Sequence, residues 1–498
     1  MKNRITVTVN GVPTTVSEGT WLCEVTGGEL PCGGHGKCGK CRVTVRGTVS
    51  PLTAEEQQFL SPAELAAGVR LSCLVRVLGD CEVTTEQTGA RAQIVVGGAL
   101  PRFDLAPSFA EHGVAIDVGT TTLAATLYHA SGKPLASTSC INPQAKWGAD
   151  VISRIEAALA GDAKALAGAI RVAIDKMIGE LVASANVNAK EIGDVVITGN
   201  TVMLSLLVEE TVEPLSHAPF AATRLFGETL TADELDLTSL SPNTTVYLPP
   251  CISAFVGADT TCAILATDLT KKNNALLVDI GTNGEIALLS EGGLTVTSTA
   301  AGPAFEGFGI SCGMRGEEGA IDKVTLVNGT LHPHVIGGGT PKGICGSGLV
   351  DAVACMLDCE VLDESGFLEE DPYPLADGIS LKGEDIRALQ LAKSAIHAGI
   401  MTLIDEKGLT LTDIKTLFIA GGFGNYLNAR NAKRIGLLPN EPTMIPQAVG
   451  NAALDGAAML LLNQDLRRSA EKIAREATVL SLSTNKRFVD YYIEGMQF

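Results

Sequence analysis

Two segments of the chain repeat one pattern: an apolar strand that ends near an aspartate, a Gly-Thr turn and a second strand. The first runs AIDVGTTTLAATLY around Asp117, and the second runs LLVDIGTNGEIALLS around Asp279. A glycine in such a turn lets the backbone approach a phosphate, and the hydroxyl, amide and N–H groups beside it can donate to the phosphate oxygens. The two copies lie 162 residues apart, which predicts paired lobes that place their turns on opposite sides of one polyphosphate.

Each hairpin supplies candidate ligands for a nucleotide and its metal ion. The predicted phosphate donors are Gly119, Thr120, Thr121, Gly281, Thr282 and Asn283. The carboxylates of Asp117 and Asp279 can hold Mg²⁺ through water, and these two aspartates are also the candidate catalytic residues. A later segment, TLFIAGGFGNY, carries Gly421 and Gly422, whose backbone can lie flat against an adenosine. Ordinary β-turns are disfavoured as an explanation because all three elements occur in one order.

Three further acidic residues are candidates for orienting a water molecule in the cleft. They are Asp259, Glu285 and Glu306. The sequence does not choose among them.

Four cysteines in the N-terminal part have the spacing of an iron–sulfur ligand set. Cys32, Cys38 and Cys41 follow the pattern C-x5-C-x2-C, and Cys73 comes after 31 intervening residues. Glycines in PCGGHGKCGKC let three thiolates converge, and the fourth comes from the predicted strand RLSCLV. The plant-type spacing is C-x4-C-x2-C, so we interpret the longer first gap as a loop variant. Structural zinc, the alternative, usually has two close cysteine pairs, so the pattern favours a 2Fe-2S cluster.

The other cysteines are interpreted as small buried hydrophobes. The chain has 13 cysteines, an odd number, and its start alternates like a strand where a secretory signal would have an apolar block. A disulfide scaffold is therefore disfavoured. Cys23 and Cys81 do not fit the ligand spacing, and Cys312 and Cys345 stand apart in glycine-rich segments.

Charge and composition exclude several classes of partner. The 498 residues include 37 Lys and Arg against 56 Asp and Glu, a formal net charge of −19, which argues against nucleic acid or an anionic membrane. Aromatic residues make up 4%, too few for a base-stacking platform. No apolar run approaches the roughly eighteen residues of a membrane span. We therefore expect a cytoplasmic protein that binds neither nucleic acid nor membrane.

The patterns of strands and helices predict a multidomain chain of the α+β and α/β classes. The segment RITVTVNGV, with its Asn-Gly turn, predicts a hairpin at the start, and the final VDYYIEGMQF is predicted as a strand. Beyond residue 112, apolar strands alternate with longer helical patterns. The predicted parts are an N-terminal domain (1–90), a linker (91–112), two lobes (113–265 and 266–462) and a C-terminal helix and strand packed on the lobes (463–498).

Residues 113 to about 462 resemble the superfamily of acetate and sugar kinases, heat-shock chaperones and actin. Its members share two phosphate hairpins and a later adenosine glycine loop. The resemblance implies an actin-like ATPase of two RNase H-like lobes. It also implies that ATP and Mg²⁺ bind in the cleft at Asp117, Asp279 and Gly421–Gly422.

Nearly the whole chain resembles the reductive activators of corrinoid proteins. The motifs are PCGGHGKCGKCRV, RLSCLVRV, AIDVGTTT, GADVISRI, VDIGTNGE, GISCGMRG, ICGSGLVD and FIAGGFGN. The resemblance implies an N-terminal β-grasp domain, similar to plant-type ferredoxins, and ATP-dependent reduction of a corrinoid from Co(II) to Co(I) for a methyltransferase system. It implies two partners, the corrinoid protein and an electron donor such as a ferredoxin or flavodoxin.

One departure from the larger relatives concerns the linker. Those relatives carry a middle segment, associated with dimerisation, between the ferredoxin and ATPase parts, whereas here only about 22 residues intervene. As a flexible chain this linker would reach roughly 26 Å, from 5–6 Å × √22. A dimer is therefore not predicted.

Other functions remain open at this stage. A kinase for a small metabolite could carry the N-terminal domain as a redox sensor, and a chaperone-like module could carry a purely structural cluster. The activators of acyl-CoA dehydratases also join ATP to low-potential electrons, but they lack this N-terminal block. Corrinoid activation is the function that the combined motifs favour.

Overall fold

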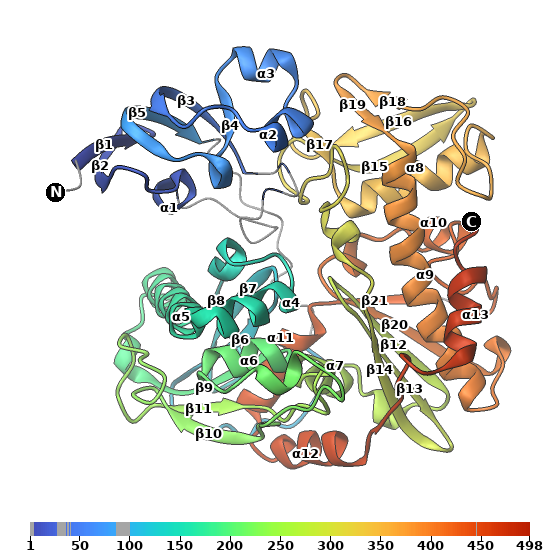
Figure 1. Cartoon of the computed structure of the whole chain (residues 1–498). Helices are drawn as coiled ribbons and strands as arrows, with labels where there is room; N and C mark the ends of the chain where they lie inside the picture. The colour runs from blue at the N-terminus through green and yellow to red at the C-terminus, as the bar shows by residue number, and fades with distance from the viewer. Residues whose placement is uncertain (1–3, 27–35, 37–38, 40, 86–99, 445) are drawn as a thin grey trace.

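The computed structural model describes residues 4–26, 36, 39, 41–85, 100–444 and 446–498. Figure 1 shows an N-terminal sheet domain in blue and two larger lobes, one mainly green and one yellow to red. Two of the predicted cluster ligands, Cys32 and Cys38, lie outside the described residues, as do linker residues 91–99.

The N-terminal domain is a five-stranded sheet with the order β2-β1-β5-β3-β4. The hairpin predicted at the start is confirmed, because β1 and β2 pair antiparallel and both turn residues have positive φ, Asn10 at 48° and Gly11 at 84°. Parallel pairing of β1 with β5 closes the sheet around a small apolar core. The elements are β1 (Arg4–Val9), β2 (Val12–Ser17), α1 (Leu22–Thr26), β3 (Arg42–Val49), α2 (Ala54–Phe59), α3 (Pro62–Ala66), β4 (Val69–Leu71) and β5 (Val77–Thr85).

The first lobe is built on a six-stranded sheet of order β10-β11-β9-β6-β7-β8. Strands β6, β7 and β8 form an antiparallel meander, and β9 joins β6 in parallel. The strands are β6 (His112–Val118), β7 (Thr122–His129), β8 (Pro134–Ile141), β9 (Ile192–Gly199), β10 (Glu228–Thr231) and β11 (Thr245–Leu248). The helices are α4 (Val151–Ala157), α5 (Ala163–Ala185), α6 (Thr201–Leu207) and α7 (Ala258–Ala266).

The second lobe repeats this arrangement with the sheet order β21-β20-β12-β13-β14-β22. Again a meander of three strands is joined in parallel by a later strand, β20, beside its first strand. The strands are β12 (Ala275–Ile280), β13 (Gly284–Ser290), β14 (Gly293–Thr299), β20 (Thr416–Ala420), β21 (Pro446–Gly450) and β22 (Thr478–Val479). The matching topologies confirm the predicted fold class, an N-terminal ferredoxin-like domain followed by a duplicated actin-like fold.

Further helices and two small sheets complete the second half of the chain. The helices are α8 (Gly346–Asp358), α9 (Gly383–Glu406), α10 (Ala429–Arg434), α11 (Ala452–Leu462), α12 (Leu466–Glu476) and α13 (Lys486–Glu494). The small sheets contain β15 (Ala320–Val327), β16 (Thr330–Val335), β17 (Gly343–Ile344), β18 (Tyr373–Ala376) and β19 (Ile379–Leu381).

A buried helix pair, α7 and α11, lies where the lobes meet. Every residue of α11 is buried, and the helix packs against α7 and against strands β6 and β9 of the first lobe. The two backbones approach so closely at Gly456 that a Cβ there would lie 2.1 Å from the carbonyl oxygen of Cys262. A segment from the end of the chain therefore completes the core of the first lobe.

Two expectations from the sequence are wrong. The predicted final strand is the helix α13, which Asn485 caps by accepting hydrogen bonds from the backbone of Arg487 and Phe488. The linker is not flexible throughout: Ala106 bonds through its backbone to Leu462 and Gln464, and the Asn463 amide donates to the carbonyl of Asp104.

Within the described residues, no helix has both the length and the apolar character needed to cross a membrane.

Candidate functional site

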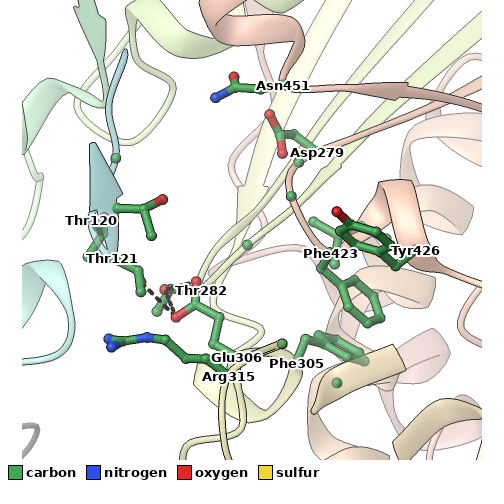
Figure 2. A pocket seen from close by; sticks show the side chains of 18 of the residues that line it. Thr120, Thr121, Asp279, Thr282, Phe305, Glu306, Arg315, Phe423, Tyr426 and Asn451 are labelled. Carbon is green, nitrogen blue, oxygen red and sulfur yellow. Dashed lines mark hydrogen bonds between the residues drawn. The ribbon is translucent and has the colours of Figure 1, made fainter. Parts of the chain in front are cut away.

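The two hairpins and the glycine loop line one cavity of 280 Å³. Figure 2 shows residues of the first hairpin on one side of this cavity and residues of the second on the other. The structure thereby brings together all the residues predicted for nucleotide and magnesium, namely Asp117, Gly119, Thr120, Thr121, Asp279, Gly281, Thr282, Asn283, Gly421 and Gly422.

In each hairpin turn the glycine closes the turn with a backbone bond, but the second turn is one residue shorter. The N–H of Gly119 donates to the carbonyl of Thr122, three residues on, and the N–H of Gly281 donates to the carbonyl of Asn283, two residues on, each at 3.0 Å. A Cβ on Gly119 would lie 2.7 Å from the Thr122 oxygen, so this turn requires a glycine.

A buried arginine donates hydrogen bonds that hold the turn of the first hairpin in place. Arg154, on α4, is fully buried and donates to the carbonyl oxygens of Thr120 (2.6 Å) and Gly148 (3.0 Å) and to the side-chain oxygen of Gln144 (3.3 Å). Burial lowers the pKa of Arg154 to about 10, so the guanidinium is charged at neutral pH. Sequence analysis missed this residue, although it lies in the quoted motif GADVISRI.

Four acidic side chains crowd the floor of the cavity. Burial raises the pKa of Asp117 and of Asp279 to about 7, and the nearby charge of Asp259 adds to the effect. Burial also raises the pKa of Asp259 to about 6 and that of Glu285 well above its usual value. Among the described residues, no three acidic, histidine or cysteine side chains are placed to hold a metal ion directly.

The carboxyl of Asp117 has a partner from the far end of the chain. Asn451, the residue before α11, donates from Nδ2 to Asp117 Oδ2 at 2.9 Å and caps α11 by accepting from the N–H of Leu454. This contact spans 334 residues of sequence. It fixes one aspartate of the site to the buried helix pair.

The carboxylate of Glu306 connects the two hairpins. It accepts hydrogen bonds from the hydroxyl of Thr121 at 2.8 Å and from that of Thr282 at 3.0 Å. Figure 2 draws these bonds beside Arg315. Of the three acidic residues left open by the sequence, Glu306 alone has a hydrogen bond to both hairpin turns among the bonds described here.

Aromatic side chains line the cavity next to the glycine loop. Phe305 and Phe423 stack with their ring centroids 4.8 Å apart and an interplanar angle of 29°. Tyr426 lies beside Phe423, and all three line the cavity. Sequence analysis proposed only glycines for this part of the site. The flat rings suit a planar base.

Two of the predicted cluster ligands meet in the N-terminal domain. The sulfur atoms of Cys41 and Cys73 are 3.2 Å apart, and both residues are buried in an apolar cluster with Leu60 and Leu71. Cys73 lies in a short 3₁₀ turn after β4, not in the predicted strand itself. Gly36 and Gly39 have φ values of +67° and +62°, conformations that glycine adopts without strain. These residues therefore fit one side of a 2Fe-2S site.

The remaining cysteines lie away from this pair of thiols or outside the ligand spacing. Cys81 belongs to the apolar core of the N-terminal domain, and Cys345 is buried at the start of α8. Cys312 is half-buried, with its thiol 3.2 Å from the carbonyl oxygen of Ser380. Cys23 is half-buried beside the Cys41 cluster, and burial raises its pKa.

The fold and the two sites together define a class of protein, an iron–sulfur electron carrier fused to an actin-like ATPase. Family profiles agree with this class along the chain. Residues 6–78 match the 2Fe-2S iron-sulfur cluster binding domain, residues 112–272 match the RACo middle region, and residues 273–498 match the C-terminal domain of RACo, the ASKHA domain. The match to the middle region coincides with the first lobe, so the expected departure from the larger relatives is not supported.

Individual proteins show the same relationship. The corrinoid activation enzyme RamQ of Eubacterium limosum is 35% identical over 78% of this chain and 70% of its own. The [Co(II) methylated amine-specific corrinoid protein] reductase of Methanosarcina barkeri is 26% identical over 77% of this chain and 76% of its own. A solved structure, the reductive activator for corrinoid, iron-sulfur protein, aligns with a TM-score of 0.71 and 28% identity over 99% of this chain and 98% of that chain.

The chain belongs to the RACo family of corrinoid-activating proteins. The predicted cofactors, a 2Fe-2S cluster, ATP and Mg²⁺, are confirmed at the level of this family. The zinc alternative for the four cysteines is therefore set aside.

Proposed function

We propose that this protein uses ATP to drive the one-electron reduction of a corrinoid protein from Co(II) to Co(I), which restores the form that accepts a methyl group. The observation that carries the proposal is the presence of two sites on one chain. The paired thiols of Cys41 and Cys73 lie in the N-terminal domain, and a cavity lined by both hairpins lies in the remainder of the chain. The names of the relatives support the same activity.

The need for ATP follows from redox potentials. The cluster, when bound, supplies one electron, and plant-type clusters have potentials near roughly −400 mV. Each 59 mV by which the cobalt couple lies below the cluster costs about 1.4 kcal/mol for one electron. Nucleotide binding can offset such a deficit only if the nucleotide-bound protein interacts more strongly with one state of the cobalt centre than with another.

The proposed roles of the site residues follow from their positions. The turns at Gly119 and Gly281 offer backbone N–H groups and threonine hydroxyls to the phosphates. Asp117 and Asp279 hold Mg²⁺ through water, which also lowers the cost of keeping these buried carboxylates charged. The backbone at Gly421–Gly422, with the rings of Phe423 and Tyr426, receives the adenosine.

The proposed partners are a corrinoid protein and a low-potential electron donor such as a ferredoxin or flavodoxin. The second partner is carried over from the resemblance to the activators of corrinoid proteins. Arg42, which follows the ligand Cys41, adds no support, because its guanidinium pairs with Glu64 at 3.2 Å and donates to the carbonyl oxygens of Gly39 and Phe59.

The experiment is a reduction assay under anaerobic conditions with reductant, ATP and a Co(II) corrinoid protein, with Co(I) followed in the visible spectrum. We expect Co(I) to form only when ATP is present. C41S should abolish reduction and keep nucleotide binding, whereas D279A should keep the cluster spectrum and lose the dependence on ATP. C81S is the matched control, because Cys81 is a core thiol outside the ligand set, and its cluster spectrum should be unchanged.

The same assay separates the other functions. A small-molecule kinase would show ATPase activity stimulated by a small acceptor and not by the corrinoid protein. A chaperone-like module with a structural cluster would form no Co(I). Either result, or an anaerobically purified protein that contains no iron, would overturn the proposal.

A further inference from the structure

The two hairpins share an anionic hydrogen-bond acceptor that is part of the protein, the carboxylate of Glu306. Thr121, at the first turn, and Thr282, at the second, both point their hydroxyls at the carboxylate of Glu306 (Figure 2). These are the donors that the proposed nucleotide site offers to phosphate oxygens. A carboxylate and a phosphate are both anionic acceptors. A hydroxyl has only one proton to donate, so it cannot form a full hydrogen bond to both at once.

Glu306 is fixed to the second lobe. It ends a short 3₁₀ turn, Pro303–Glu306, and the N–H of Gly302 before this turn donates to the carbonyl of Thr282 at 3.0 Å. After the turn, Gly307 has a φ of +79°, and a Cβ there would lie 2.4 Å from the carbonyl oxygen of Met314. The backbone therefore holds the carboxylate at the second hairpin, and its bond to Thr121 reaches across to the first lobe.

The surroundings of Glu306 are those of an anion site. Burial raises its pKa, whereas the two threonine hydroxyls and the positive charges of Arg315 and Arg154 oppose this shift. Two hydroxyls and two guanidinium groups around one acidic group form the kind of environment that also stabilises a phosphate. Glu306 thus interacts with the hydroxyl donors and the positive charges that would also stabilise a polyphosphate.

We propose that Glu306 is an internal competitor of the nucleotide: its carboxylate occupies the hairpin hydroxyls when the cleft is empty, and the phosphates of ATP must displace it. This inference rests on the proposed nucleotide site. It has a mechanical consequence. Because Glu306 is anchored to the second lobe, its displacement breaks a direct bond to the first lobe, so nucleotide binding exchanges a protein contact between the lobes for one made through the ligand.

The test compares nucleotide affinities of the full-length protein by titration calorimetry with Mg²⁺ present. The variants are E306Q, which keeps the shape but removes the charge, and E306A, which removes the acceptor. The probes are a non-hydrolysable ATP analogue, ADP and adenosine. We expect the ATP analogue to bind about tenfold more tightly to both variants than to the wild type, which corresponds to about 1.4 kcal/mol. Adenosine has no phosphate, and its affinity should not change.

A matched control removes a charge from the same cavity without touching either hairpin. Asp322 lines the cavity and contacts His334 at 2.6 Å, so D322N tests whether any loss of negative charge tightens binding. We expect its effect on the ATP analogue to be much smaller than that of E306Q. Thermal unfolding adds a second measurement, because E306A loses the contact between the lobes and should be less stable than the wild type only without nucleotide.

The outcomes are distinct. Equal or weaker binding of the ATP analogue to both Glu306 variants would overturn the inference, as would an equal gain for adenosine or for D322N. A slower hydrolysis rate with unchanged affinity would assign Glu306 to the chemical step instead. If the wild type binds none of the phosphorylated probes, the proposed nucleotide site itself fails.

Discussion

The two phosphate hairpins share a Gly-Thr turn that lines the cavity, although the second turn is one residue shorter, and they have different supports. In the first, side chains from distant segments hold the turn: Asn142 donates to the Gly119 carbonyl at 2.8 Å, Asn200 donates to the Thr120 hydroxyl at 2.9 Å, and Arg154 holds the Thr120 carbonyl. In the second, backbone packs directly on backbone, because a Cβ on Gly421 would lie 2.7 Å from both Asp279 Oδ1 and the carbonyl oxygen of Ile280.

This difference shows that a duplicated fold can keep a ligand-binding turn while changing what makes it rigid. A buried polar network stabilises a turn only if every group in it has a hydrogen-bond partner. The loss of one side chain therefore leaves several buried groups without a partner. Close packing of glycine backbone depends on the absence of a side chain, so the addition of one methyl group disrupts it. The two hairpins should therefore fail in different ways.

The largest expected effect comes from removing the support of the first hairpin. R154M leaves three acceptors, two of them buried, without their donor, so we expect a loss of about 3–5 kcal/mol in the free energy of unfolding, together with the loss of nucleotide binding. Denaturant unfolding and calorimetry measure the two effects. R171M is the control. Arg171, on the same lobe, also donates to a backbone carbonyl, that of Leu207, but its ion-pair partner Asp236 is exposed. If R154M bound ATP normally, the buried network would not support the site.

The second hairpin should break on the addition of one methyl group. Gly421 has a φ of +91°, so G421A adds backbone strain to the close contact with Asp279, and we expect a loss of about 2–3 kcal/mol with weaker nucleotide binding. Its neighbour provides the control for stability, because a Cβ on Gly422 has no protein atom within 4 Å, so G422A should leave the free energy of unfolding nearly unchanged. Equal losses of stability in the two variants would contradict the difference between the hairpins.

The contact between Asn451 and Asp117 should contribute less. N451A removes a hydrogen bond to the aspartate and the cap of α11, for an expected loss of about 1–2 kcal/mol and weaker binding of MgATP. N485A removes the cap of the peripheral helix α13 and should reduce stability without any effect on the nucleotide. A normal affinity in N451A would show that Asp117 does not need this partner.

The smallest effect concerns pH and tests whether the two aspartates are equivalent. Both have pKa values of about 7 in the folded protein, above the usual value near 3.9, so the folded state holds more protons between these values and stability falls as pH rises. Between pH 6 and 7 each carboxyl should reduce stability by about 1 kcal/mol, and the reduction should level off above about pH 8. D117N and D279N should each reduce the fall in the free energy of unfolding between pH 6 and 7 by the contribution of one carboxyl. A flat profile for the wild type would contradict the raised pKa values.

The sequence predicted the parts of the site that are local. The strand, Asp, Gly-Thr and strand pattern places Asp117 and Thr121 in one turn, and the chain alone defines that neighbourhood. Arg154 and Asn451 could not be predicted in the same way, because each reaches its partner across the fold and no spacing marks it. Glu306 was one of three acidic candidates, but its bonds to both hairpins depend on the fold and could not be predicted from the sequence. The final helix was missed because YYI suggests a strand, whereas the cap at Asn485 and packing against α9 favour a helix.

The position of α11 has a consequence for how the protein is made. The ribosome releases the strands of the first lobe early, and the last of them ends at Leu248, yet the helix that covers β6 and β9 lies much later in the chain, at residues 452–462. Until that segment emerges, one apolar face of the nascent sheet has no cover from α11. We expect this interval to be the period in which the growing polypeptide depends most on ribosome-associated chaperones.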